Sequence, residues 1–160
     1  MNIEKVREYL RQEGYFDRLH EFEQSTATVD LAAEALGTAP DQIAKTLSFY
    51  DKDGGAILVV AAGKRRVDNR KFKDQFGLKA RMLSPEDTGR LTGNEAGGVC
   101  PFLVPPEASV WLDVSLRDHD TVYPAAGSAH SGVALSCEEL EALSKPVGWC
   151  DVCKPLEPEA

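Results

Sequence analysis

Lys45 is the first residue whose surroundings point to chemistry, because it stands in the apolar stretch DQIAKTLSFY. Side chains two apart in a strand share a face, so Lys45 is expected on the face of Ile43, Leu47 and Phe49. A buried lysine is unfavourable unless its ammonium meets an anion or a cavity. One interpretation is therefore a point charge for a phosphate or a developing oxyanion. The other is a lysine at the sheet edge that extends its ammonium into solvent.

A loop rich in glycine and proline, TGNEAGGVCPFLVPPE, occupies residues 92–107. Glycine lets a ligand approach the main chain closely, and proline fixes the backbone. The amides of Gly98, Val99 and Cys100 can therefore be directed at a carbonyl oxygen, as in an oxyanion hole. A plain turn between a helix and a strand explains the same glycines equally well. The pattern matches neither G-x-G-x-x-G nor a P-loop, which excludes nucleotide binding of those kinds.

Two further small groups of residues raise the question of a nucleophile. Cys100 lies inside the glycine loop, but no nucleophile signature surrounds it, so we expect it to line a pocket and not to form a thiolate. Ser128 and His130 lie in AAGSAHSG and either bind a polar ligand or cap a hairpin. The chain has no G-x-S-x-G elbow and no recognisable Ser-His-Asp order, which disfavours classical serine hydrolase chemistry.

The four cysteines include one C-x-x-C motif, formed by Cys150 and Cys153 near the C-terminus. A structural zinc site usually takes four ligands, and the chain offers neither a second C-x-x-C nor paired histidines. A redox dithiol would be expected in a βαβ context, which is absent around the motif. We therefore expect reduced, partly buried thiols and no metal or cofactor; zinc binding and redox chemistry remain the alternatives.

The charge of the chain is unevenly distributed. Its 160 residues carry a net charge of -8, which by itself disfavours a nucleic-acid partner. Residues 64–81, however, hold eight basic and two acidic side chains, so this segment is +6 and the remainder is -14. Such a basic patch suits a limited phosphate surface such as a tRNA end. A solvated helix face is the alternative.

The surrounding pattern predicts a single α+β domain over residues 1–160, with a mixed, mostly antiparallel sheet flanked by helices. Helices are expected over 3–10, 28–37, 68–77, 84–93 and 137–144. Strands are expected over 43–50, 55–63, 79–84, 109–116, 121–128 and 131–136, with an edge strand within 145–153. We expect residues 154–160 to form a frayed tail. The chain shows no secretory signal and no membrane span, so a cytoplasmic location is expected.

Five stretches, in order and spacing, resemble the YbaK/ProX family, whose members are free-standing relatives of the editing domain of bacterial prolyl-tRNA synthetase. They are IAKTLSF, VVAAGKRRVDNRKF, SPEDTGRLTGNEAGGVCPF, LDVSL and AAGS. The resemblance covers about residues 20–145. It implies a mixed sheet with flanking helices around a pocket. It also implies a trans-editing deacylase, which hydrolyses the ester of a misacylated tRNA, often tRNA for proline carrying a small noncognate amino acid.

The resemblance also implies the roles of individual residues. The catalytic set is Lys45, Gly98, Val99, Cys100 and Pro101. The substrate-binding set is Thr46, Gly97, Phe102, Ser128 and His130. The tRNA-binding set is Lys64, Arg65, Arg66, Arg70 and Lys71. No protein nucleophile, metal or cofactor is implied. Thr46 follows Lys45 as in the YbaK-like branch, whereas the alanine-directed branch commonly has asparagine there, so alanine specificity is not carried over.

The expected partners are misacylated tRNA and, as a helper, prolyl-tRNA synthetase; neither DNA nor a membrane is expected. A protein of the same fold that binds tRNA or a synthetase without turnover is the rival hypothesis, because function depends on the site and not on the fold. The presence of both Lys45 and the G-x-x-P loop, Gly98 to Pro101, favours the enzyme.

Overall fold

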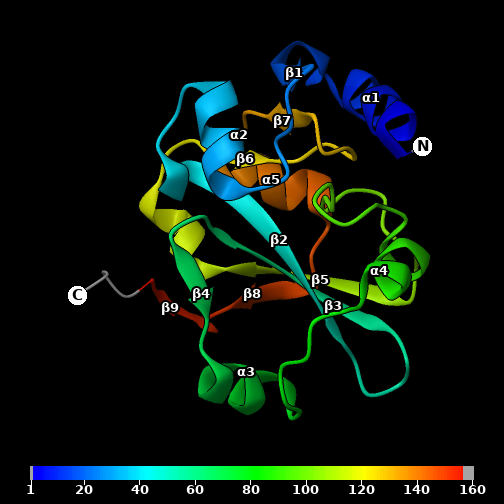
Figure 1. The fold of residues 1–160 in the computed structure, drawn as a ribbon, viewed down its shortest axis with the longest axis vertical. Helices are drawn as coiled ribbons and strands as arrows, with labels where there is room; N and C mark the ends of the chain where they lie inside the picture. The colour runs from blue at the N-terminus through cyan, green and yellow to red at the C-terminus, as the bar shows by residue number, and fades with distance from the viewer. Residues whose placement is uncertain (1, 157–160) are drawn as a thin grey trace.

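The computed structural model describes residues 2–156 and has a mixed five-stranded sheet at its centre (Figure 1). The strand order is β6 (Tyr123–Pro124), β2 (Ile43–Tyr50), β3 (Ala56–Ala62), β5 (Ala108–Asp113) and β8 (Gly148–Cys150). Two small sheets join β1 (Leu19–Glu21) to β7 (Ser131–Val133) and β4 (Arg65–Val67) to β9 (Cys153–Pro155). The α-helices are α1 (Asn2–Glu13), α2 (Val29–Leu36), α3 (Asn69–Phe76), α4 (Pro85–Thr92) and α5 (Cys137–Ser144). Three short 3-10 helices are η1 (Phe16–Arg18), η2 (Pro40–Gln42) and η3 (Val114–Asp118).

The mixed sheet flanked by helices is confirmed, but the balance of strand directions in the central sheet is not the predicted one. The β2–β3 hairpin is antiparallel, whereas β2–β6, β3–β5 and β5–β8 are parallel. Parallel neighbours require crossover connections, and here the chain passes through α3, α4 and the glycine loop between β3 and β5. The two small sheets are antiparallel.

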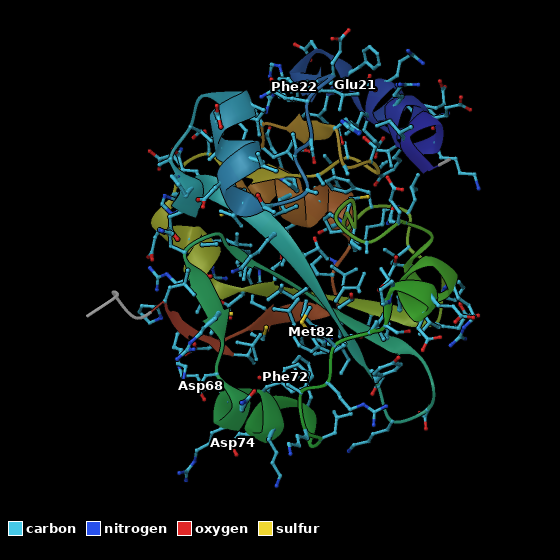
Figure 2. The ribbon with its side chains drawn as sticks, viewed as in Figure 1. Glu21, Phe22, Asp68, Phe72, Asp74 and Met82 are labelled. Carbon is cyan, nitrogen blue, oxygen red and sulfur yellow. The ribbon has the colours of Figure 1, made fainter. Side chains whose placement is uncertain are left out.

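β3 is the centre of the sheet, because all seven of its residues are buried. Its alternate side chains enter two different cores. Leu58 and Val60 pack in the larger core with α1, α4 and α5. Ile57 and Val59 pack in the smaller core, which α3 closes through the fully buried Phe72. Figure 2 shows Phe72 directed from α3 toward the sheet.

The ends of three helices have local causes in the sequence. Thr28 caps α2 by accepting a hydrogen bond from the Leu31 amide, and Asp68 and Ser84 cap α3 and α4 in the same way. A glycine with positive φ ends each of these helices, at Gly37, Gly77 and Gly93. Within residues 2–156, none of the helices combines the length and the apolar character needed to cross a bilayer.

Three predicted elements need correction. Residues 79–84 contribute one isolated bridge, Met82 to Phe49, instead of a strand. The strand expected over 121–128 is reduced to Tyr123–Pro124, because the residues after Pro124 form a loop that leads to β7. The C-terminal segment forms two strands, β8 and β9, and β9 takes in the first residues of the predicted frayed tail. Residues 157–160 of that tail lie outside the described residues.

The glycine loop between α4 and β5 is held by close backbone packing. Gly97 has φ +88°, a conformation that other residues rarely adopt. A Cβ added to Gly98 would lie 2.8 Å from the Ser128 carbonyl carbon and 2.9 Å from the Ala129 nitrogen. Glycine at position 98 therefore lets the loop pack directly against the backbone of the 125–131 loop. This contact places two distant parts of the chain beside the same end of β2.

We expect Gly98→Ala to lower the free energy of unfolding by about 1–3 kcal/mol, because the new methyl group would overlap rigid backbone. Gly89→Ala is the matched control: Gly89 lies inside α4, and a Cβ there meets nothing within 4 Å. That substitution should raise the free energy of unfolding by about 0.5–1 kcal/mol. Urea denaturation measures both. A Gly98→Ala protein as stable as the wild type would contradict the close contact.

Candidate active site

A cavity of about 370 Å³ lies where α2, the start of β2, the glycine loop and the residues around β6 and β7 meet. Val29, Ala32 and Leu36 of α2 supply an apolar wall. β2 contributes residues 43–47, and the glycine loop contributes Gly97 and Val99. A mostly apolar cavity with a few polar groups is typical of a small-molecule site. Its size suits a small side chain together with part of the group that carries it.

The outer edge of β2 is open where it borders this cavity. β3 covers one edge along the whole strand, whereas β6 covers only the first two residues of the other edge. At the far end, the Ser48 carbonyl accepts a hydrogen bond from the Leu83 amide at 3.0 Å. Backbone groups alternate in direction along an antiparallel strand, so Thr46 directs its N–H and C=O away from β3, as Ser48 does. Thr46 therefore presents an open backbone edge beside the cavity.

The side chain of Thr46 also carries an unused polar atom. Its Oγ1 is buried and has no hydrogen-bond partner among the described residues, and Thr46 lines the cavity. An unpartnered buried hydroxyl is unfavourable and is an exception that calls for an explanation. A ligand in the cavity that bonds this hydroxyl would supply one.

Lys45 also lines the cavity, and its ammonium is held in place. Nζ donates to the Gly63 carbonyl at 3.2 Å and to the Arg65 carbonyl at shorter range. An ammonium has three donors, so these two bonds orient it and leave one N–H for a ligand. Burial lowers the pKa of Lys45 below its ordinary value, while Cys153 and Asp41 act in the opposite direction. The alternative interpretation, an edge lysine that extends its ammonium into solvent, is thus not what the structure shows.

The backbone amides of the glycine loop are not all available. Gly98 donates its amide to the Glu95 carbonyl at 3.0 Å, so the prediction that this amide faces a substrate is wrong for this conformation. The amides of Val99 and Cys100 have no hydrogen-bond partner within residues 2–156. Pro101 is buried directly after them, and its ring restricts the backbone there. Two adjacent donors on a stiff loop remain for a carbonyl oxygen.

Cys100 does not line the cavity, contrary to expectation. Its side chain is fully buried in the larger core, where Sγ contacts the Phe102 carbonyl. Burial raises the pKa of the Cys100 thiol to about 12. A thiol with that pKa is not a nucleophile near neutral pH. Only the backbone of Cys100 can take part in the site.

Three predicted substrate-binding side chains also lie away from the cavity. Phe102 is fully buried in the larger core. Ser128 is buried in its loop, where Oγ accepts a hydrogen bond from the His130 amide. The His130 side chain is exposed and lies 3.0 Å from the Gln24 carbonyl through Nδ1. None of the three lines the cavity, and their role in substrate binding stays a prediction.

The basic segment is partly neutralised within the protein. Arg65 pairs with Asp118 at 3.0 Å, and Lys71 pairs with Asp151 at 3.2 Å. Lys64 and Arg70 have exposed side chains, as does Arg66. The tRNA-binding role of these five residues stays a prediction. Because Arg65 belongs to β4, beside the turn that holds Lys45, the basic surface lies next to the site.

Other residues at the cavity had no distinct signal in the sequence. Thr26 and Ser131 line it and are joined by two hydrogen bonds, at 3.1 Å and 3.3 Å, between the Thr26 hydroxyl and the Ser131 backbone. Met82 lies at the cavity with an exposed side chain and appears in the middle of the view in Figure 2. Tyr123 of β6 also lines the cavity. Thr26 and Ser131 are far apart in sequence. The β1–β7 pairing and the hydrogen bond from the Thr26 amide to the Ala129 carbonyl at 2.6 Å bring them together.

The C-x-x-C motif lies in the smaller core, where the Cys153 thiol is close enough to Lys45 to influence its pKa. Cys150 and Cys153 are both buried free thiols in the smaller core. Burial, with a smaller contribution from Asp113, raises the pKa of Cys150 to about 12 and that of Cys153 further. Within residues 2–156, no group of three or more histidine, cysteine or acidic side chains is arranged to hold a metal ion.

Comparison with known proteins places the chain among editing proteins. Residues 23–143 match the family described as aminoacyl-tRNA editing domain. The chain is 45% identical over 157 residues to the uncharacterized protein YwhH of Bacillus subtilis, covering 98% of this chain and 100% of YwhH. It is 28% identical to the multifunctional Ser/Thr-tRNA deacylase ProXp-y of Escherichia coli, covering 86% of this chain and 84% of that protein.

A comparison of structures points to the same kind of protein. A solved structure described as a "putative trans-editing enzyme for prolyl tRNA synthetase" superposes with a TM-score of 0.84 at 30% identity, covering 96% of this chain and 97% of that one. The fold class and the resemblance found in the sequence are thereby confirmed. The chain belongs to the aminoacyl-tRNA editing domain family.

Proposed function

We propose that this protein is a trans-editing hydrolase that cleaves the ester bond of misacylated tRNA carrying a small noncognate amino acid, with tRNA for proline as the first candidate. The observation that carries the proposal is one cavity bordered by the oriented Lys45 ammonium, by Val99 and by the Thr46 hydroxyl. Among residues 2–156, neither this hydroxyl nor the adjacent amides of Val99 and Cys100 have a hydrogen-bond partner. The relatives named as a Ser/Thr-tRNA deacylase and a prolyl-tRNA synthetase trans-editing enzyme support it.

In the proposed reaction, the amides of Val99 and Cys100 hold the ester carbonyl oxygen and stabilise the negative charge that develops there. The free N–H of Lys45 binds a phosphate or hydroxyl oxygen of the terminal adenosine. Water adds to the carbonyl carbon, the bond to the ribose oxygen breaks, and a proton from the water passes to that oxygen. The neighbouring free hydroxyl of the adenosine assists the water. Positioning and electrostatics carry the rate, and no thiol of the protein takes part.

The cavity selects the amino acid by size and polarity. Its α2 wall is apolar, while the Thr46 hydroxyl and backbone offer hydrogen bonds on the opposite side. Steric exclusion rejects large side chains. One methylene in such a pocket changes binding by only about 1–3 kcal/mol, so we expect a small set of accepted residues instead of one.

Binding of the tRNA body uses the surface beside Lys45. Lys64, in the turn between β3 and β4, and Arg70 and Lys73, in α3, have exposed side chains, while the chain outside residues 64–81 is acidic. Phosphate contacts of this kind lose strength as salt increases. Because the chain carries a net charge of -8, which opposes tRNA binding, we propose that prolyl-tRNA synthetase contributes affinity for the tRNA.

The first test is a deacylation time course on tRNAs charged with alanine, cysteine, serine, threonine and proline. We expect loss of one or more small noncognate residues, and Lys45→Ala should slow it at least about 100-fold, because an oriented electrostatic contact to the transition state is worth about 2.7–4 kcal/mol. Lys52→Ala removes an exposed lysine in the β2–β3 turn and serves as the matched control, with unchanged rate. No acceleration on any charged tRNA, with prolyl-tRNA synthetase added, would favour a binding module without turnover.

Thr46→Val tests whether the unpaired hydroxyl serves a ligand. We expect deacylation to fall about 3- to 10-fold, because one hydrogen bond to substrate is lost. The free energy of unfolding should stay unchanged or rise by up to about 1 kcal/mol, because a buried unsatisfied oxygen is removed. Activity would thus fall without a loss of stability.

The control for this test is Thr92→Val. The Thr92 hydroxyl is fully buried and donates to the Thr88 carbonyl at 2.6 Å. Its loss should therefore destabilise the protein by about 1–3 kcal/mol. A Thr46→Val protein that is destabilised to the same extent, or that keeps full activity, would show that the Thr46 hydroxyl has a structural role only.

A further inference from the structure

The ammonium of Lys45 depends on one short turn. Both of its protein acceptors lie where β3 connects to β4: Gly63 follows β3, and Arg65 is the first residue of β4. Residues 63–65 are here called the 63–65 turn. Lys45 itself lies on β2, so the position of its Nζ is set by how this turn sits relative to that strand. Whatever fixes the turn therefore fixes the cation in the site.

Two sets of contacts hold the turn: the β4–β9 side, where the Leu156 amide donates to the Lys64 carbonyl at 2.9 Å, and Asp41, which joins the turn to the start of β2. Asp41 lies in η2, directly before β2. Its Oδ1 accepts a hydrogen bond from the Lys64 amide at 2.9 Å and lies 3.9 Å from Nε of Arg65. Its backbone carbonyl accepts from the Gly63 amide at 3.4 Å. One aspartate thus contacts all three residues of the turn.

The carboxylate is in turn held by η3. His119, which follows η3, places Nε2 2.7 Å from Asp41 Oδ2. Burial alone would raise the pKa of Asp41, but the bonds from His119 and the Lys64 amide, with the nearby Arg65 charge, leave it below its ordinary value. The charged form is therefore the one that the structure stabilises. Both carboxylate oxygens are used, which fixes the side chain orientation.

Close packing supports the same arrangement. A Cβ added to Gly63 would lie 2.0 Å from the Pro40 carbonyl oxygen, so the turn is pressed against η2. Arg65 is anchored on its outer side by Asp118 at 3.0 Å, but that pair is at the surface, where such contacts contribute little. Of the two aspartates, Asp41 is therefore the one whose side chain holds the turn against the start of β2.

We propose that Asp41 is a positioning residue for Lys45: it holds the 63–65 turn so that the carbonyls of Gly63 and Arg65 orient the ammonium in the cavity. This inference rests on the proposed function only for its effect on catalysis. The geometric part, that loss of the Asp41 carboxylate releases the Lys45 ammonium, stands independently of what the protein hydrolyses.

The first experiment observes the ammonium directly by ¹⁵N NMR of lysine-labelled protein, with the Lys45 signal assigned by its loss in Lys45→Ala. Hydrogen-bonded ammonium protons exchange slowly with water, and freed ones exchange fast. In Asp41→Ala we expect exchange at Lys45 to accelerate at least about tenfold, the equivalent of one lost hydrogen bond. Asp41→Asn keeps an oxygen for the Lys64 amide and should retain most of the protection. Asp118→Ala should leave the exchange rate at Lys45 within about twofold of the wild-type rate.

The second experiment measures kcat/KM for deacylation in a double-mutant cycle of Asp41→Ala and Lys45→Ala. Asp41→Ala alone should lower kcat/KM about tenfold, with partial rescue by Asp41→Asn. In the Lys45→Ala background it should have no further effect, because residues that act through one group are not additive. A purely structural role would give additive losses.

Unchanged exchange at Lys45 in Asp41→Ala would overturn the proposal, and so would additive losses in the cycle. If the wild type deacylates nothing, the proposed function fails, but the NMR measurement still decides whether Asp41 positions Lys45. The two failures are therefore distinguishable.

Discussion

The pairing of β2 with β3 is the constraint on which the rest of the structure depends. β3 is buried on both faces and joins the two cores, so its position is set by the whole fold. β2 pairs with β3 continuously from Ala44 to Tyr50. The backbone of Lys45 and Thr46 is therefore fixed by its pairing with a fully buried strand. Because β6 covers only the start of the outer edge of β2, the strand offers backbone and side-chain groups to a ligand. A rigid strand with an open edge is a suitable support for a binding site.

The site is assembled from groups that are held by other parts of the protein and not by each other. The glycine loop is fixed by its contact with the 125–131 loop through Gly98. Lys45 is oriented by two carbonyls of the turn after β3. Neither arrangement includes an activated nucleophile, and the one cysteine in the loop is buried with a raised pKa. Such a site suits an ester that water can already attack, for which positioned donors supply the main acceleration.

Local chemistry allowed much of the fold to be predicted. The caps at Thr28, Asp68 and Ser84 and the glycines that end the same helices have short-range causes, and those helices were predicted closely. Strand direction depends on connections that residue patterns do not encode, so the parallel pairings were missed. Lys45 and Thr46 were found at the cavity because one strand positions both. The positions of the Phe102, Ser128 and His130 side chains relative to the cavity could not be predicted, since packing between distant loops sets their directions.

The most direct test of the account is a structure with a non-hydrolysable substrate analogue, an adenosine whose 3′ position carries the amino acid through an amide. The account predicts that the aminoacyl group lies between α2 and Thr46. Its carbonyl oxygen should lie about 3 Å from the Val99 or Cys100 amide, and Lys45 Nζ should contact the adenosine. An analogue bound elsewhere, for example against β4 and β9, or bound in the cavity with its carbonyl oxygen turned away from the glycine loop, would contradict the central claim.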